Sequence, residues 1–368
     1  MSAVAALLER AEAGARLRRE ELALLLAAEG EDQAALFAAA DRVRRRTMGD
    51  GVYLRGLIEF SNICRQDCLY CGIRRSNRKV ERYRMTPAEI LATAKVAERL
   101  GYGTVVLQSG ESDALSPDEV AAVIRAIKRE TSLAVTLSLG ERTYEEYKLW
   151  KQAGADRYLL RHETADPDLF ARLRPGRTLA ERVQCLYYLR SLGYQVGSGF
   201  MVGLPGQTVE SIAADIDLLV ELNVEMAGIG PFIPHPDTPL AGAAPGTLEM
   251  TLKALAVTRL AIPDAHIPAT TALGTIHPEG RQLGLRVGAN VIMPNLTPPP
   301  YRARYQLYPG KICLFEDPET CAPCVEALIV AQGRYVARGP GHSPRAAFAQ
   351  PAAKEEMPDA RQPVGELH

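Results

Sequence analysis

The sequence contains no apolar run close to the roughly 20 residues that a membrane-spanning helix requires, so no membrane span is expected. It also has no excess of charge, because 43 basic and 44 acidic residues leave a net charge of −1. This balance gives no sign of the basic surface that binding to nucleic acid or to an anionic membrane requires. The N-terminal stretch, MSAVAALLERAEAGARLRRE, mixes charged with apolar residues, which argues against a signal peptide.

Features typical of disulfide-rich proteins and of zinc sites are also missing. The seven cysteines lie mostly in short-spaced groups, which suits metal binding in a reducing compartment better than disulfide bonds. A cytoplasmic, oxygen-sensitive protein is therefore expected. The first group, Cys64, Cys68 and Cys71, has no fourth cysteine or histidine nearby, whereas structural zinc generally requires four ligands. A zinc knuckle and structural thiols remain the alternatives to the interpretation that follows.

The first cysteine group has the spacing Cys-x3-Cys-x2-Cys and follows an apolar segment, residues 53–60, that predicts a buried strand. Three thiolates at this spacing can hold three irons of a cubane iron–sulfur cluster. The fourth iron then stays open for a small molecule, as a catalytic metal site requires. Loops after the strands of a parallel α/β protein build its active site, so the position of these cysteines favours catalysis.

Short apolar segments alternate with helical patterns along most of the chain. Strands are expected at residues 53–60, 104–108, 133–138, 156–161, 195–202, 227–232, 267–272 and 287–293. Helices are expected at residues 86–100, 116–130, 143–153, 178–192, 207–222, 247–261 and 277–284. Two helix starts place a capping hydroxyl before a proline, at Thr86-Pro87 and Ser116-Pro117. Eight alternating units predict an α/β fold, a complete (β/α)8 TIM barrel.

Composition divides the chain into four parts. Residues 1–48 carry apolar residues at helical spacing and predict an N-terminal helical cap. Residues 49–300 are expected to form the barrel, and residues 301–338 a C-terminal extension with a second cysteine group. Residues 339–368 are rich in Pro, Ala, Gly and charge, which predicts a disordered tail.

Residues that can carry chemistry follow the ends of the second and fourth strands. The second strand ends in small residues, and Glu111 there can accept from an amine; an ordinary turn is the alternative. The fourth strand reads RYLLRHETA, and its alternation places Arg157, Arg161 and Glu163 on the face that points into the barrel. Buried charges need partners, so either an anionic ligand or an internal ion-pair network is expected.

Other polar residues extend this predicted site. Thr270 and Thr271 on the seventh strand, with Thr136 and Arg55, predict an anion-binding surface, although β-branched packing inside the barrel would use the same threonines. Arg182, on the helix after the fourth strand, can reach a cofactor carboxylate or is a solvated charge.

The cysteine stretch and its context resemble the radical S-adenosylmethionine superfamily, including the aromatic Tyr70 before the third cysteine. Further segments, among them VLQSGE, AGADRYLLRHETA, MVGLPGQT, IPATTALGTI and YQLYPGKIC, resemble the HydE family of [FeFe]-hydrogenase maturases over about residues 50–335. The resemblance implies a [4Fe-4S] cluster with one open iron, and reductive cleavage of S-adenosylmethionine to a 5′-deoxyadenosyl radical. It implies a substrate that is a mononuclear iron with cysteine, carbon monoxide and cyanide, and a diiron product. HydG as the supplier of the substrate, HydF as the acceptor of the product, and a one-electron reductant are also implied.

The resemblance also assigns roles to residues. Cofactor contacts are implied for Tyr70, Gln108, Ser109, Gly110, Glu111, Glu163, Arg182 and Tyr305. A substrate cavity is implied, in which four residues are predicted to act catalytically: Arg157, Arg161, Thr270 and Thr271. The remaining lining residues would be Arg55, Thr136, Met293 and Tyr308. Some members carry an accessory cluster, which Cys313, Cys321 and Cys324 match with the spacing Cys-x7-Cys-x2-Cys; leftover surface thiols are the alternative.

Two related enzymes and one non-enzyme are the competing hypotheses. Biotin synthase would need a second cluster inside the barrel, and no strand except the first is followed by cysteine. A mutase such as methylornithine synthase is expected to share much of the barrel, but the accessory cysteines and the paired threonines favour the HydE family. An iron–sulfur electron carrier or scaffold would not cleave S-adenosylmethionine.

Overall fold

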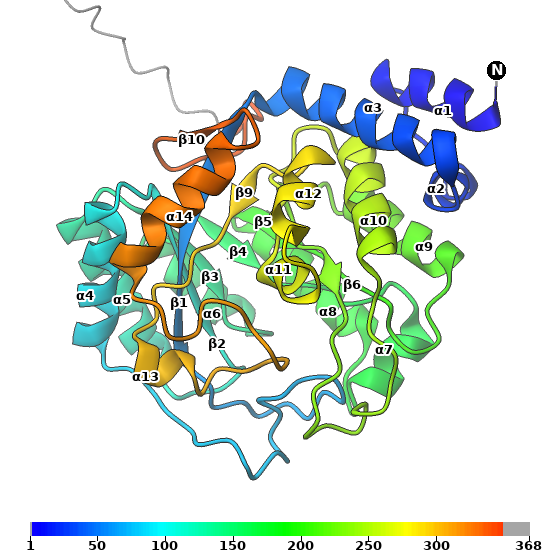
Figure 1. The fold of residues 1–368 in the computed structure, drawn as a ribbon. Coiled ribbons are helices and arrows are strands. Elements are labelled where there is room, and N and C mark those ends of the chain that lie inside the picture. Colours follow the sequence, from blue (N-terminus) through cyan, green and yellow to red (C-terminus); the bar gives the residue numbers. More distant parts are fainter. Residues whose placement is uncertain (1, 349–368) are drawn as a thin grey trace, which may run out of the picture.

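The computed structural model describes residues 2–348, which form a curled parallel β-sheet with helices around it (Figure 1). The main sheet has the strand order β10-β1-β2-β3-β4-β5-β7, and β9 also pairs with β1. Its strands are β1 (Gly51–Ser61), β2 (Thr104–Ser109), β3 (Ala134–Ser138), β4 (Arg157–Leu159), β5 (Gln195–Ser198), β7 (Met226–Ala227), β9 (Val291–Ile292) and β10 (Tyr335–Ala337). A second sheet pairs β6 (Met201–Val202) with β8 (Gly230–Pro231). All strand pairings are parallel.

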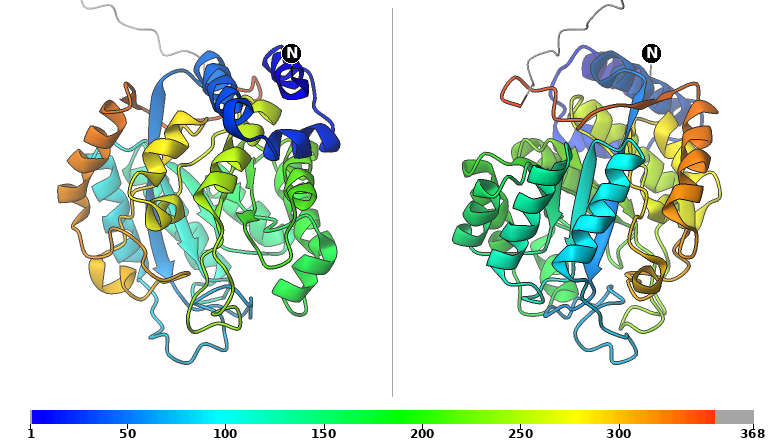
Figure 2. Two further views of the ribbon diagram at one scale, coloured as in Figure 1. Left: turned by 45° about the vertical axis from the view of Figure 1, so that its right-hand side comes forward. Right: turned by 90° about the vertical axis from the view of Figure 1, so that its left-hand side faces the viewer.

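Helices connect the strands and cover the outside of the sheet (Figures 1 and 2). They are α4 (Pro87–Arg99), α5 (Pro117–Glu130), α6 (Tyr144–Gln152), α7 (Pro167–Leu173), α8 (Leu179–Ser191), α9 (Val209–Glu221), α10 (Leu248–Ala261), α11 (Thr271–Ile276) and α12 (Gly280–Arg286). Helices α4, α5, α6, α8 and α9 each begin with a Ser/Thr capping box, in which the hydroxyl and a side chain three residues later satisfy two backbone N–H groups. The predicted starts at Thr86-Pro87 and Ser116-Pro117 are confirmed.

The parallel α/β fold is confirmed, but the prediction of a complete barrel is wrong at one seam. The expected seventh strand at residues 267–272 does not form, and only single bridges link His266 to Met226 and Pro268 to Val291. Two local choices explain this. Proline has no N–H for a strand ladder, and Thr270 uses its hydroxyl to cap α11. The sheet is therefore curled into an open barrel whose seam is held by bridges.

Glycine splits two other expected strands. A side chain on Gly199 would place its Cβ 2.0 Å from the carbonyl oxygen of Gly228, so the two segments cross too closely for any larger residue. The expected strand at residues 195–202 becomes β5 and β6, and the one at 227–232 becomes β7 and β8. The second strand of each pair leaves the main sheet and forms the small sheet.

The N-terminal helices α1 (Ala3–Glu12), α2 (Arg19–Leu26) and α3 (Gly30–Met48) lie over the end of the barrel where the strands begin (Figure 2). Leu22, Leu36 and Val43 belong to the same hydrophobic core as the barrel. The cap therefore shares one core with the barrel. No helix within residues 2–348 has the length and apolar character to cross a membrane.

After β9 the chain forms α13 (Pro299–Arg302) and α14 (Pro318–Val330) and pairs β10 with the start of β1. The segment 339–348 then runs across the end where the strands begin, whereas a disordered tail was expected from residue 339. The Pro340 carbonyl accepts from Thr104 Oγ1 (2.8 Å), and Arg345 forms two bonds to Asp264 (2.7 and 2.8 Å). The physical reason is that buried donors of the barrel bind these backbone carbonyls. Residues 349–368, also predicted to be disordered, lie outside the described residues.

Candidate active site

The three cysteines of the first group lie in the loop of residues 62–85, at the end of the barrel where β1 finishes (Figures 1 and 2). Arg82 organises this loop, because its guanidinium donates to the carbonyl oxygens of Asn62, Ile73 and Arg74 at 2.6 to 2.7 Å. Gly72 packs against the C-terminal extension, where a Cβ would lie 2.2 Å from the Gln306 carbonyl oxygen. The loop is thus held by protein contacts.

The thiols of Cys64, Cys68 and Cys71 converge in this loop. Burial raises the pKa of all three, and the nearby Cys68 and Cys64 raise that of Cys71 further. Within the described part of the chain, no three His, Cys, Asp or Glu side chains surround one common metal-ion position. Cysteine ligands of a cubane bind different irons, so their sulfurs need no such common position.

The end of β2 supports the cysteine loop. Gly110 is required there because a Cβ would lie 2.3 Å from the Ile63 carbonyl oxygen, so the backbone that approaches closely is the loop itself. The buried Glu111 carboxylate accepts from Arg65 (3.3 Å), from Gln66 and from the backbone N–H of Glu141 (2.9 Å). Glu111 therefore ties the loop to β2 and β3. Gln108 and Ser109 lie at the same strand end.

An arginine cluster lies beside the cysteines, and the sequence interpretation named its Arg182 but missed Arg174 and Arg177. Arg174, Arg177 and Arg182 surround the buried Glu141, whose Oε1 lies 2.7 Å from Arg182 Nε and 3.6 Å from Arg174 Nη2. Arg182 Nη2 and Arg174 Nη2 have no directed hydrogen bond to any group in residues 2–348, and both side chains are buried. Three arginines share the one Glu141 carboxylate, so the cluster keeps positive charge that fits the carboxylate of a ligand. The sequence signal was the RLRPGR stretch combined with the glutamate of LSLGE.

Three other predicted cofactor residues join this cluster. Burial raises the pKa of Tyr70, and its neighbours Cys68 and Glu163 raise it further, while its hydroxyl lies 3.5 Å from Arg174 Nη1. Burial also raises the pKa of Tyr305, with Cys71 and Cys64 among the groups that add to it. Tyr70, Glu163, Arg182 and Tyr305 therefore lie around the cysteine loop, as expected from the sequence.

The predicted alternation of Arg157, Arg161 and Glu163 on one strand face is wrong, because β4 ends at Leu159. Arg161 and Glu163 lie in the loop beyond it, where Arg161 Nη2 is 2.9 Å from Glu163 Oε2. Glu163 has a backbone φ of 68°, in the left-handed region, which costs of order 1–3 kcal/mol for a residue other than glycine. This strain lies at a predicted cofactor residue.

Arg157 and Arg55 lie at the other end of the barrel, against the C-terminal segment. Arg157 Nη2 donates to the Pro340 carbonyl (2.6 Å) and lies 2.9 Å from His342 Nδ1, and Arg55 Nη2 donates to the Gly341 carbonyl (3.2 Å). Burial lowers the pKa of Arg157 to about 10. The chain's own carbonyls thus occupy donors that the sequence had indicated for an anionic substrate.

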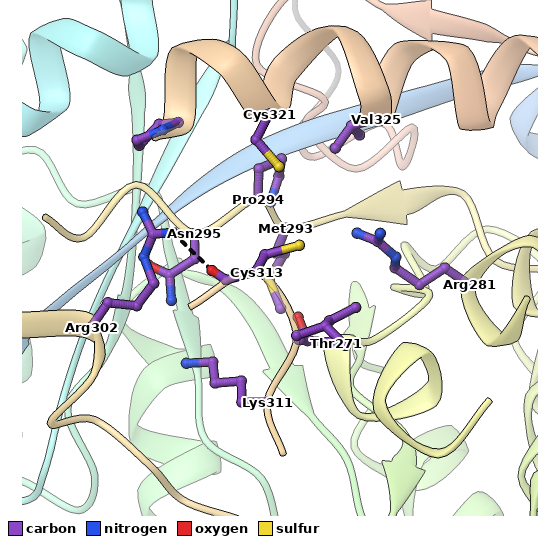
Figure 3. Close-up of a pocket in the computed structure, with 12 residues that line it drawn as sticks. Thr271, Arg281, Met293, Pro294, Asn295, Arg302, Lys311, Cys313, Cys321 and Val325 are labelled. Carbon is purple, nitrogen blue, oxygen red and sulfur yellow. Dashed lines mark hydrogen bonds between the residues drawn. The ribbon is translucent and has the colours of Figure 1, made fainter. Parts of the chain in front are cut away.

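The remaining predicted cavity residues are spread out. Thr136 pairs in register with Arg157, and its buried hydroxyl has no partner within residues 2–348. Burial raises the pKa of Tyr308, and the positive charge of Arg161 partly opposes this rise, which places the two side chains near each other. Thr271 and Met293 line a cavity of about 30 Å³ between the barrel wall and the C-terminal extension (Figure 3). This volume suits water, and it is too small for a metal complex.

The second cysteine group borders the same cavity. Cys313 and Cys321 line it, and the Cys313 carbonyl accepts from Arg302 Nη1 at 2.8 Å (Figure 3). Burial raises the pKa of Cys321 to about 11, and Cys313 and Cys324 contribute in the same direction. Cys313, in the loop before α14, therefore lies near Cys321 and Cys324 on the first turns of that helix.

Comparison with known proteins agrees with this site. Residues 58–219, which contain the first cysteine group and the arginine cluster, match the Radical SAM superfamily. The fold and the site thus define a radical S-adenosylmethionine enzyme. The [FeFe] hydrogenase maturase subunit HydE of Thermotoga maritima is 55% identical over 304 residues, which cover 83% of this chain and 87% of the relative. The chain belongs to the HydE family of [FeFe] hydrogenase maturases.

Other relatives are more distant. The 3-methylornithine synthase of Methanosarcina barkeri is 30% identical over 288 residues, which cover 77% of this chain and 81% of that enzyme. A crystal structure of methylornithine synthase has a TM-score of 0.80 at 28% identity and covers 90% of this chain and 97% of that one. A crystal structure of HydG, a maturase of the [FeFe]-hydrogenase, has a TM-score of 0.77 at 20% identity over 90% of this chain and 75% of that one, which shows a shared fold.

Proposed function

We propose that this chain acts in [FeFe]-hydrogenase maturation, on a mononuclear iron complex that carries cysteine, carbon monoxide and cyanide. The product would be a diiron precursor. The observation that carries the proposal is the 55% identity to a HydE subunit over most of both chains. The convergence of four predicted cofactor residues around the cysteine loop supports it. HydG as supplier of the substrate, HydF as acceptor of the product and a one-electron reductant belong to the same proposal.

The residues present fit a [4Fe-4S] cluster and S-adenosylmethionine. Cys64, Cys68 and Cys71 would hold three irons, and the guanidinium groups of Arg174 and Arg182, which share Glu141 with Arg177, would bind the cofactor carboxylate. Glu163, Tyr305, Tyr70 and the β2 end at Gln108 and Ser109 would complete the cofactor site. When bound, the cluster and S-adenosylmethionine supply a 5′-deoxyadenosyl radical by one-electron reduction. The barrel wall excludes water from the space where that radical meets its target.

The substrate would bind on the barrel side of the cofactor site. Arg161 and Tyr308 lie together there; Arg161 pairs with Glu163 through Nη2, and its Nε has no hydrogen-bond partner in residues 2–348. A cyanide-bearing iron complex is anionic and would supply an acceptor for that nitrogen. Thr270, Thr271 and Met293 would form the adjoining wall.

The proposal has two linked tests. The chain should restore hydrogenase activity to a strain that lacks its own HydE. The purified, cluster-loaded enzyme should form 5′-deoxyadenosine from S-adenosylmethionine, and replacing Cys64, Cys68 and Cys71 with Ala should abolish this. Cys185→Ala is the matched control, because Cys185 is a buried thiol on α8, outside both cysteine groups. Formation of 5′-deoxyadenosine by the triple variant would refute the cluster assignment.

Methylornithine synthase remains the second candidate, because its crystal structure superposes with a TM-score of 0.80. Detection of 3-methylornithine formation, with no restoration of hydrogenase activity, would favour it. A biotin synthase activity has less support. All seven cysteines lie in the described residues, and none lies on a strand of the barrel where it could hold a second internal cluster.

A further inference from the structure

A buried polar chain lies directly behind the loop that carries Glu163. His162 Nε2 lies 3.4 Å from Asp215 Oδ1, and both side chains are completely buried. On the other side of the ring, His162 Nδ1 lies 3.0 Å from Ser198 Oγ. Ser198 Oγ donates to the Leu160 carbonyl (3.0 Å), so toward the ring it is the acceptor and His162 Nδ1 donates to it. Aspartate, histidine and serine thus lie side by side in one buried row from α9 to β5.

Asp215 also holds the residues that follow Glu163. Its Oδ1 accepts from the backbone N–H of Ala165, and its Oδ2 accepts from Gln207 Nε2 at 3.3 Å. Gln207 in turn accepts from the Gly203 N–H (2.6 Å) and donates to the Met201 carbonyl (2.8 Å). One buried carboxylate therefore joins the loop after β4 to the turn after β6.

Glu163 is the residue between these two anchor points. Its φ of 68° is unfavourable for a residue with a Cβ, so the surrounding contacts must impose it. Its N–H donates to the Gly199 carbonyl (3.0 Å) and its carbonyl accepts from the Met201 N–H (3.1 Å). Asp215 accepts from the Ala165 N–H and lies 3.4 Å from the His162 ring, so its contacts restrain the backbone on both sides of Glu163.

We propose that Asp215 and His162 are positioning residues that hold Glu163 in its left-handed conformation and so orient its carboxylate toward S-adenosylmethionine. The proposal rests on the proposed function, in which Glu163 contacts the cofactor. A buried carboxylate destabilises the fold unless it has polar partners. The partners of Asp215 are His162, Ala165 and Gln207, and the first two flank Glu163. Neither Asp215 nor His162 touches the cofactor site itself.

The test compares substitutions that keep or remove the contact to Asp215. Gln places its Nε2 near the position of His Nε2, so His162→Gln keeps a donor to Asp215, whereas His162→Asn reaches only Ser198. Asp215→Asn offers one acceptor in place of two, so either Ala165 or Gln207 loses its partner. Asp217→Asn is the control on the same helix, because Asp217 pairs with Arg16 and Arg19 beside the N-terminal cap.

Two measurements are made on each variant. The first is hydrogen exchange of the peptide 160–168 in enzyme without S-adenosylmethionine, and it does not depend on any activity. The second is the affinity of the cluster-loaded enzyme for S-adenosylmethionine, by calorimetry and by the change the ligand causes in the spectrum of the reduced cluster. Asp215→Asn and His162→Asn should exchange faster and bind about tenfold more weakly, or about 1.4 kcal/mol. His162→Gln and Asp217→Asn should stay within about threefold of wild type.

Wild-type affinity in both Asp215→Asn and His162→Asn would overturn the proposal, whatever the exchange rates. Equal losses in all four variants would also overturn it, because general destabilisation would then be the cause. If Asp215→Asn does not fold, the pair His162→Asn and His162→Gln decides the question. A wild-type enzyme that does not bind S-adenosylmethionine would contradict the proposed function, and this inference with it.

Discussion

Arg157 and Arg161 lie four residues apart, yet one binds the C-terminal segment and the other pairs with Glu163. The first is fully buried and satisfied by neutral carbonyl, hydroxyl and amide oxygens. The second pairs with Glu163 through Nη2 and keeps Nε without a partner in the described chain. Only the second has donors left for an anionic substrate, so the two positions make a matched pair for mutation.

Arg161→Met should stop maturation while slow cleavage of S-adenosylmethionine continues. Losing a charge-assisted contact should weaken binding of the iron substrate by about 1.5–3 kcal/mol. Formation of 5′-deoxyadenosine without substrate and maturation of the hydrogenase are measured side by side. Equal loss of both would mean that Arg161 serves the cofactor, through Glu163, or serves the fold.

Arg157→Met is the comparison, and it should act on stability. Its removal takes from the Thr104 hydroxyl oxygen the only donor that the described chain offers it, and takes one of two donors from the Pro340 carbonyl, which keeps the bond from Thr104; this costs about 1–3 kcal/mol. Maturation by the folded fraction should stay at the wild-type level. If the variant loses maturation while its thermal stability is unchanged, Arg157 belongs to the substrate site after all.

At the scale of the elements, the C-terminal segment 339–348 departs most from what composition indicates. The segment packs against the start of β1 and β4 through carbonyl groups and the His342 ring. Because its partners are two buried arginines, the charge of His342 matters to its docking. Burial, with Arg157 nearby, lowers the pKa of His342 to about 4.

The docked segment should therefore lose stability as the pH falls. A histidine whose pKa is lowered by folding contributes stability above its unfolded pKa of about 6.5, and that contribution is lost as the pH falls from there toward the folded value. The expected loss in the free energy of unfolding between pH 7 and pH 5 is about 1–2 kcal/mol. Urea unfolding at both pH values and hydrogen exchange of residues 339–345 measure it.

His342→Asn is the control for this pH dependence. Asparagine can accept from Arg157 near the position of Nδ1, and it does not titrate in this range. The variant should show a smaller loss between pH 7 and pH 5, and His266, whose pKa burial also lowers, should account for part of what remains. An unchanged slope in the variant would exclude His342 as the titrating group.

The cysteines at α14 should be dispensable for maturation. They lie beyond a cavity of about 30 Å³, and the bond from Arg302 uses the Cys313 backbone, which a substitution leaves in place. The triple Ala variant of Cys313, Cys321 and Cys324 should keep the first cluster, cleavage of S-adenosylmethionine and maturation. Its iron content should fall only if an accessory cluster is present in the wild type. A variant that keeps the first cluster but loses maturation would refute this.

For the protein as a unit, one hydrophobic core joins the N-terminal cap, the sheet and the outer helices. The cysteine loop attaches to that core through Arg82, Glu111 and the packing of Gly72 and Gly110. These contacts involve protein groups alone. The fold should therefore not depend on the cluster, in contrast to small zinc domains that unfold without metal.

Removal of the cluster by oxidation and chelation should leave the barrel folded. The thermal midpoint should fall by less than about 5 °C, since each 1 kcal/mol corresponds to about 2–4 °C for a chain of this order of size. Calorimetry and circular dichroism measure it. Loss of the cooperative transition on cluster removal would show that the cluster is part of the core. Arg82→Met should instead impair reloading of the cluster, because the loop carbonyls lose their common donor.

Local sequence patterns were sufficient for a large part of the site and the fold. The cysteine spacing after a strand, the Ser/Thr-Pro helix starts and the first five parallel strands depend on residues close together in the chain. Hydrogen bonds within a helix turn, and the period of apolar residues along a strand, are set by near neighbours. The family resemblance, which is carried by short motifs, named Tyr70, Glu163, Arg182 and Tyr305, and the structure places all four around the cysteine loop.

The partners of buried polar groups could not be found in this way. At Thr270 a strand pattern and a helix cap competed, and the contacts of the folded barrel favoured the cap. Arg157 donates to the carbonyl of Pro340, which lies 183 residues later in the chain. Asp215 accepts from the N–H of Ala165, which lies 50 residues earlier. Such pairings depend on which distant segments packing brings together, since a buried donor binds whatever acceptor the fold places within reach. The residues near each group in the sequence therefore do not predict its partner.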